Sequence, residues 1–198
     1  MTNDEFCRGV RRGERRYNAA FTLIELIVVT TVIIILTGLV LTTVGYIQKK
    51  GARSRAETEI AAMSAACESY KADNVIYPRG IDTDGLNAQT SGDPSVSQYK
   101  NASLALYNSL FGATNGSRTP NAGARSYFVF KPNMLSPTDQ TQNVQYIRDP
   151  FGNSYGYSTI QAATGTGGYN PTFDLWSTSG LMTSPPSTAD QNQWIKNW

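Results

Sequence analysis

One apolar segment constrains the fold of this chain more than any other feature. Residues 21–47 (FTLIELIVVTTVIIILTGLVLTTVGYI) carry a single charged side chain, Glu25. As a helix, residues 26–47 would be roughly 33 Å long, against about 30 Å for the hydrocarbon core of a bilayer. The rest of the chain is polar and rich in Gly, Ser, Thr and Asn, so it has no matching apolar mass to bury this helix. We therefore expect a transmembrane helix over residues 21–48.

The residues before this span decide what kind of membrane segment it is. Residues 1–20 contain five Arg and end in the small pair Ala19-Ala20. An ordinary secretory signal is cut after its apolar region, which is then lost. No Ala-x-Ala pattern follows this span, because the next residues are QKKG at 48–51. The arrangement therefore differs from that of an ordinary cleaved signal.

The junction AFTLIEL at residues 20–26, between a basic leader and an apolar run, resembles the class III signal of type IV pilins and type II secretion pseudopilins. The resemblance implies that a prepilin peptidase removes residues 1–20 by cutting between Ala20 and Phe21. The same enzyme would methylate the new amino terminus, and the apolar helix would be kept. Most members of the family have Gly before the cut, where this chain has Ala20.

Glu25 needs a physical explanation with or without the family. A carboxylate near the start of a transmembrane helix needs a partner or a route to water, since an unpaired charge in hydrocarbon costs several kcal/mol. The resemblance implies a role in filament assembly: Glu25 of one subunit neutralises the Phe21 amine of its neighbour and sets their axial stagger. The alternative is that Glu25 extends to the cytoplasmic headgroups of the membrane.

Charge and cysteine content narrow the function further. The leader has five Arg against Asp4, Glu5 and Glu14, a balance of +2 that equals the net charge of the whole chain. The remainder is formally neutral, so we expect no nucleic-acid partner. Cys7 lies in the leader, which leaves Cys67 without an intrachain partner and predicts a small packing residue.

No enzyme is expected from the sequence. The chain has no histidine, no G-x-S-x-G pattern and no phosphate-binding loop. Asp82 and Asp84 are the nearest approach to paired carboxylates, and we interpret both as solvated turn residues.

After the span, residues 49–73 continue as a helix of good helix formers. Apolar side chains recur on it at spacings of four and three and so form one stripe. They are Ala56, Ile60, Met63, Cys67 and Tyr70. We expect this amphipathic extension, 49–77 with its connection, to pack on the following domain. The helix should end at Asn74, ahead of Pro78.

The remaining residues, 78–198, are expected to form a globular head. A short helix is predicted over residues 102–111 and closed by Gly112. Strands are predicted over residues 126–131, 154–159 and 171–177, and residues 90–98 are predicted to form a loop. Three or four antiparallel strands laid on the apolar stripe would give an α+β fold: a long N-terminal helix, half transmembrane and half amphipathic, packed on a small antiparallel sheet.

Several segments are similar to the major, G-type, pseudopilin of type II secretion, which implies a pilin-like fold. They are YKADNVIYP at 70–78, GLNA at 85–88, RDPFGNSYGY at 148–157, FDLWS at 173–177, and the ending from Ala189-Asp190 to Asn197-Trp198. Residues 89–144 match little.

The same family often binds calcium in its last loop. The loop of this chain, residues 177–186 (STSGLMTSPP), lacks the family's acidic ligand. Asp174, Ser177 and Asp190 remain as candidate ligands, but two carboxylates rarely make a tight calcium site without several carbonyls. We therefore expect no bound cofactor, and Pro185-Pro186 to stiffen the loop instead.

Together these features predict a structural subunit of a type II secretion pseudopilus. The resemblance implies a bacterial inner-membrane protein with its leader in the cytoplasm and its head in the periplasm. Its expected partners are the prepilin peptidase, other pseudopilin subunits, and the membrane assembly platform with its ATPase. Two alternatives remain open: a type IV pilin-like subunit for adhesion, motility or DNA uptake, and a membrane-tethered binding module.

Overall fold

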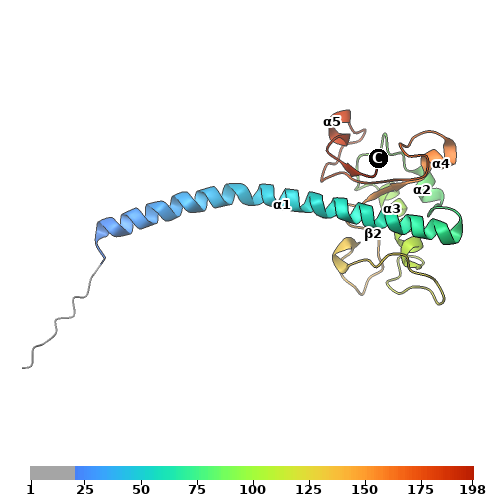
Figure 1. Cartoon of the computed structure of the whole chain (residues 1–198), viewed down its shortest axis with the longest axis horizontal. Coiled ribbons are helices and arrows are strands. Elements are labelled where there is room, and N and C mark those ends of the chain that lie inside the picture. The colour runs from blue at the N-terminus through green and yellow to red at the C-terminus, as the bar shows by residue number, and fades with distance from the viewer. Residues whose placement is uncertain (1–20) are drawn as a thin grey trace, which may run out of the picture. The chain divides into compact units, whose positions relative to one another are not determined.

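The computed structural model describes residues 21–198, without the side chains of residues 41–44. The predicted leader and Ala20 lie outside the described residues. The chain divides into two compact units, Met1–Gly45 and Tyr46–Trp198. Within the second unit, the short helices and strands gather along the C-terminal part of the long helix α1 (Figure 1).

Helix α1 runs without a break over Leu23–Asn74. It ends where the sequence predicts, because Val75 adopts a left-handed conformation with φ 70°. The last turn is closed by Val75 N–H, which donates to Lys71 O at 2.7 Å. The Asn74 amide donates to Tyr70 O at 2.9 Å, so two carbonyls at the helix end have partners.

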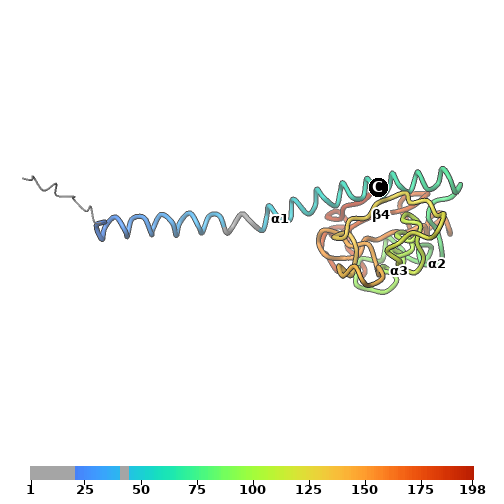
Figure 2. The backbone as a smooth tube through the Cα atoms, turned by 90° about the horizontal axis from the view of Figure 1, so that it is seen from below, coloured from blue at the N-terminus to red at the C-terminus, as the bar shows by residue number. Residues whose placement is uncertain are grey.

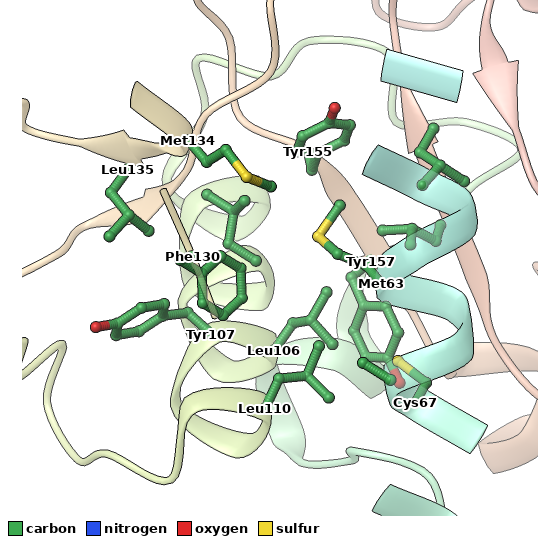
Figure 3. Close-up of a cluster of buried hydrophobic side chains, with 14 of the residues drawn as sticks. Met63, Cys67, Leu106, Tyr107, Leu110, Phe130, Met134, Leu135, Tyr155 and Tyr157 are labelled. Carbon is green, nitrogen blue, oxygen red and sulfur yellow. The ribbon is translucent and has the colours of Figure 1, made fainter. Parts of the chain in front are cut away.

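The predicted apolar stripe faces the head. Ala56, Met63 and Cys67 are fully buried and Ile60 is 4% exposed, whereas Tyr70 is half-buried. Figure 2 shows the head on one side of this part of α1. In Figure 3, Met63 and Cys67 point from α1 toward Leu106 and Leu110. The head therefore supplies the partner that the stripe requires.

Helix α3 spans Ser97–Phe111 and begins earlier than predicted, at Ser97 instead of Ala102. The predicted loop 90–98 is wrong over its last two residues. Tyr99, in the first turn, is fully buried with its ring centroid 5.5 Å from that of Trp176, and this packing holds the turn. The helix ends as predicted, at Gly112 with φ 76°, a conformation that glycine adopts without strain.

Three short strands form one antiparallel sheet in the order β3-β4-β5. They are β3 (Gly156–Ser158), β4 (Asp174–Ser177) and β5 (Ile195–Lys196), with Trp176 opposite both Gly156 and Lys196. The predicted strands 154–159 and 171–177 are confirmed with narrower bounds. Every residue of β3 and β4 is buried, since this sheet has packed side chains on both faces. A separate antiparallel pair joins β1 (Leu135–Ser136) to β2 (Tyr146–Ile147).

The predicted strand 126–131 is wrong. Tyr127 and Phe128 donate their backbone N–H groups to the single carbonyl of Leu110, at the end of α3, and pair with no strand. Phe130 is buried with its ring centroid 5.0 Å from that of Tyr107. The aromatic side chains that suggested a strand therefore pack against a helix end.

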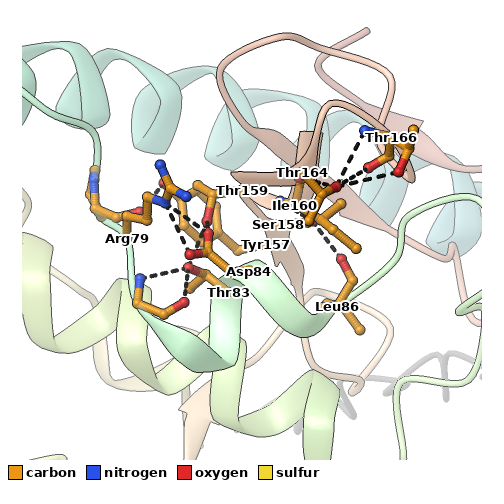
Figure 4. Close-up of polar contacts among 12 residues, drawn as sticks. Arg79, Thr83, Asp84, Leu86, Tyr157, Ser158, Thr159, Ile160, Thr164 and Thr166 are labelled. Atoms are coloured by element: carbon orange, nitrogen blue, oxygen red, sulfur yellow. Dashed lines mark hydrogen bonds and ion pairs between the residues drawn. The ribbon is translucent and has the colours of Figure 1, made fainter. Parts of the chain in front are cut away.

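Short helices complete the head: α2 (Ile81–Gly85), η1 (Pro132–Met134), α4 (Ile160–Thr164) and α5 (Thr188–Gln191). Asp82 is exposed, as expected of a turn residue, although it lies in α2. The interpretation of Asp84 is wrong. It is half-buried, pairs with Arg79 at 3.0 Å and accepts a hydrogen bond from Thr159 Oγ1 at 2.7 Å (Figure 4). Asp84 thus connects α2 to the end of β3.

The described residues form an α+β fold, with one long N-terminal helix and small antiparallel sheets. Nineteen buried residues form the main core between α1, α3 and the strands. A second cluster lies between α3 and the C-terminal segment. It comprises Leu86, Ala88, Tyr99, Ala102, Trp176 and Trp194.

Candidate functional site

The start of α1 is closed by a reciprocal set of hydrogen bonds between Thr22 and Glu25. Thr22 donates its backbone N–H and its hydroxyl to one Glu25 carboxylate oxygen, at 2.9 and 2.8 Å. In return, Glu25 N–H donates to Thr22 Oγ1 at 3.3 Å. This is the capping-box arrangement, in which a Thr before the helix and a Glu three residues later satisfy each other's backbone donors. Glu25 therefore has a partner within its own chain.

The part played by Thr22 was not among the predictions from the sequence. The signal was present, since Thr22-Leu23-Ile24-Glu25 has the T-x-x-E spacing of a capping box ahead of an apolar run. Phe21, the residue expected to become the amino terminus, precedes this box and is 85% exposed. Its predicted processing partner, Ala20, lies outside the described residues.

Apolar side chains that follow the box are exposed. Leu23, Ile24 and Ile34 are each at least 70% exposed, and the most apolar window of the helix is 0% buried. By length and composition α1 can cross a membrane, with a mean hydropathy of 2.7 in that window. A signal sequence passes the same test, but the core helix of a soluble protein would be mostly buried. This part of α1 is therefore a candidate membrane span by length, composition and exposure.

The three candidate calcium ligands each have contacts of their own. Asp174 is buried at the start of β4 and accepts the backbone N–H groups of Tyr169 and Asn170, both at 2.8 Å. Burial raises the pKa of Asp174, and the two N–H donors oppose that rise. Ser177, at the other end of β4, donates its hydroxyl to Asp149 at 2.5 Å.

Asp190 lies in α5 and forms a second capping box. Its carboxylate accepts from the hydroxyl and backbone N–H of Ser187, at 2.7 and 3.0 Å. These bonds lower the pKa of Asp190. Within residues 21–198, no group of three or more His, Cys, Asp or Glu residues is arranged to hold a metal ion.

Asp149 is a buried carboxylate that was not among the candidate residues predicted from the sequence. It is 2% exposed and accepts N–H bonds from Phe151 at 3.0 Å and Asn153 at 2.8 Å, besides the Ser177 hydroxyl. Burial raises its pKa, and these hydrogen bonds act in the opposite direction. Asp149 therefore ties the 149–153 turn to the end of β4. Its signal was the Asp-Pro-x-Gly turn at residues 149–152.

Polar contacts join α1 to the head around the buried stripe. Tyr155 donates its hydroxyl to Glu59 at 2.8 Å, and Arg55 pairs with the same carboxylate at 2.7 Å. Near the helix end, Arg125 pairs with Asp73 at 2.6 Å. The helix from Tyr46 onward and the head are therefore one packed unit.

Comparisons with protein-family models, curated proteins and solved structures find no match.

Proposed function

We propose that this chain is a structural subunit of a type II secretion pseudopilus or a closely related pilus-like filament, with a pilin-like fold. One observation carries the proposal: in a helix of 52 residues, the part from Tyr46 onward packs on a head, and the most apolar window is 0% buried. Such a helix suits a bilayer before assembly and a bundle of identical helices afterwards. A lone capped carboxylate at its start provides a polar contact in either setting.

In this proposal, prepilin peptidase cuts before Phe21 and methylates it. The subunit then stays in the bacterial inner membrane with its head in the periplasm. The assembly platform and its ATPase extract subunits from the membrane, the apolar helix segments bundle in the filament core, and the heads coat the outside. The work of the filament is mechanical.

The processing step is tested by the intact mass of the protein purified from membranes of a host with an active prepilin peptidase. A chain that begins at Phe21 and carries one added methyl group is the expected result. A mass that retains residues 1–20 would contradict the proposal, because an unprocessed subunit cannot place its amine beside Glu25 of a neighbour.

The assembly step is tested by two substitutions that separate the charge of Glu25 from its capping role. Glu25→Gln keeps a side-chain acceptor at this position, since Gln also serves in capping boxes, but it removes the negative charge. Glu25→Val removes both. If Glu25 neutralises the Phe21 amine of a neighbour, both variants insert into the membrane and neither enters filaments. Wild-type filament yield from Glu25→Gln would show that only the cap is needed.

No observation favours the tethered binding module. A glycan-binding surface would use Trp176, Trp194 and Trp198. Trp198 is half-buried and stacks on Tyr169 with ring centroids 4.6 Å apart. Trp176 and Trp194 are 0% and 2% exposed. They stack on each other with ring centroids 6.1 Å apart and serve as core.

A further inference from the structure

A groove runs along α1 beside the end of the apolar segment. One wall is formed by the side chains of Tyr46, Lys49, Lys50 and Arg53, on consecutive turns of α1. The opposite wall consists of Phe151, residues 179–181 and Gln193. The groove has a volume of 770 Å³, within the range of small-molecule sites in proteins. All of these residues belong to the unit Tyr46–Trp198.

The groove is strongly positive. Three of the lining side chains are cationic and none is acidic. Arg53 is held in place, because it donates to Gln193 O at 2.9 Å and pairs with Glu57 at 3.3 Å. Lys49 and Lys50 are exposed and form no ion pair with any described residue. The structure thus leaves two uncompensated ammonium groups in a groove whose third cation helps to hold its walls together.

The chain places these lysines where phospholipid headgroups lie. The apolar stretch ends at Ile47, and Lys49 follows at a rise of about 3 Å along the helix. Tyr46, which is 70% exposed, has the amphipathic ring typical of the membrane–water interface. Phe151 and Leu181 add apolar surface to the far wall. A ligand with an anionic head next to an apolar body would match both parts of this lining.

We propose that this groove binds the phosphate headgroup of an anionic phospholipid, with Lys49 and Lys50 as the phosphate-binding residues. The inference rests on the membrane anchoring in the proposed function and goes beyond it, since filament assembly by itself requires no lipid site. An anionic lipid held beside the head would fix the height and tilt of the subunit before extraction. The lipid would have to be released as the subunit leaves the membrane.

The test compares lipid selectivity in the full-length protein. The protein is purified in mild detergent, incubated with phosphatidylglycerol or phosphatidylcholine of the same acyl chains, and the retained lipids are counted by native mass spectrometry. Two basic groups near a membrane surface should favour the anionic lipid by about thirtyfold. In Lys49→Gln/Lys50→Gln this preference should fall to about one. The matched control, Lys100→Gln/Lys131→Gln, removes the same charge outside the groove and should keep the wild-type ratio.

Each other outcome overturns the inference. An equal preference in the wild type and the groove variant would assign the selectivity to non-specific charge. Competition by glycerol 1-phosphate as strong as by the lipid would mean a soluble phosphate site instead. A groove variant that keeps lipid selectivity but forms no filaments would make the groove a contact between subunits. Extraction of the wild-type protein by alkaline carbonate would refute membrane anchoring, and with it both this inference and the proposed function. The other three outcomes would overturn only this inference and leave the proposed function intact.

Discussion

Thr22 and Glu25 perform two tasks at the start of α1. Their hydrogen bonds satisfy backbone donors that a helix end leaves free. They also give the carboxylate a partner in its own chain at the start of an apolar run. Under the proposed function, this pairing would lower the cost of holding Glu25 in hydrocarbon relative to that of an unpaired charge. In the proposed filament, the same carboxylate oxygens would accept a hydrogen bond from the amine of a neighbouring subunit.

Replacing Thr22 by Val should loosen the first turn of α1. Loss of an N-terminal cap costs about 1 kcal/mol, so the Glu25 amide, which donates to the Thr22 hydroxyl, should exchange with solvent about fivefold faster. Hydrogen exchange of the detergent-solubilised protein, followed by NMR, measures this rate. Thr22→Ser keeps a hydroxyl and should exchange at the wild-type rate. An unchanged rate in Thr22→Val would mean that the box contributes nothing to the helix start.

Among the elements, the pair β3–β4 depends on one glycine. Gly156 lies opposite Trp176 in the ladder, and a Cβ atom at this position would sit 2.3 Å from the Trp176 ring. That ring cannot move aside, because it is fully buried and stacks on Trp194. The aromatic core of the C-terminal segment therefore requires the absence of a side chain at residue 156.

Gly156→Ala should destabilise the head. Forcing extra volume into a packed site typically costs about 1–3 kcal/mol, and here the contact is with a rigid ring. The free energy of unfolding from denaturant titration, with near-UV circular dichroism as the probe of the tryptophans, measures the loss. Gly80→Ala is the matched control, because its φ of −177° suits any residue and nothing lies within 4 Å of the added Cβ. Equal stability of the two variants would contradict the packing argument.

In the molecule as a whole, the packed core holds five weakly acidic groups away from water. Burial raises the pKa of one thiol, to about 12, and of four phenols. They are Cys67, Tyr99, Tyr107, Tyr155 and Tyr157. Their ordinary pKa values, about 8.5 for Cys and about 10 for Tyr, apply to the unfolded chain. All five shifts have the same sign, so their effects on stability add.

The protein should therefore lose stability in alkali. Above the ordinary pKa values the unfolded chain has released protons that the folded chain still holds, so each rise in pH favours unfolding. The slope should approach about 1.4 kcal/mol per pH unit for each group. Denaturant midpoints measured from pH 7 to pH 11 test this decline in the free energy of unfolding. Tyr155→Phe removes one of the five groups, so it should reduce the slope by about 1.4 kcal/mol per pH unit. A flat profile up to pH 11 would contradict the burial of these hydroxyls.

The local pattern of residues was enough to predict most of α1 and its division into an apolar half and an amphipathic half. Length and lack of charge predicted the apolar half, and the spacing of Ala56, Ile60, Met63 and Cys67 predicted the buried stripe. Local residue patterns also predicted the end of α3 at Gly112 and the buried strands around Tyr157 and Leu175. These signals lie within a few turns or strand positions of the chain, so no distant partner is needed to interpret them.

What needed the tertiary structure were the features that depend on a partner far along the chain. Residues 126–131 have the composition of a strand, but a strand requires a second strand beside it. Here the backbone N–H groups of Tyr127 and Phe128 donate to Leu110 O in α3 instead. Asp149 became a buried junction because Ser177 lies beside it, at a sequence separation of 28. The sequence alone determined where a long helix forms and which of its faces is buried, since helix periodicity and hydropathy are local properties. Only the fold decided which backbone and side-chain polar groups meet, since those pairings arise when distant segments are packed together and every buried donor must find an acceptor.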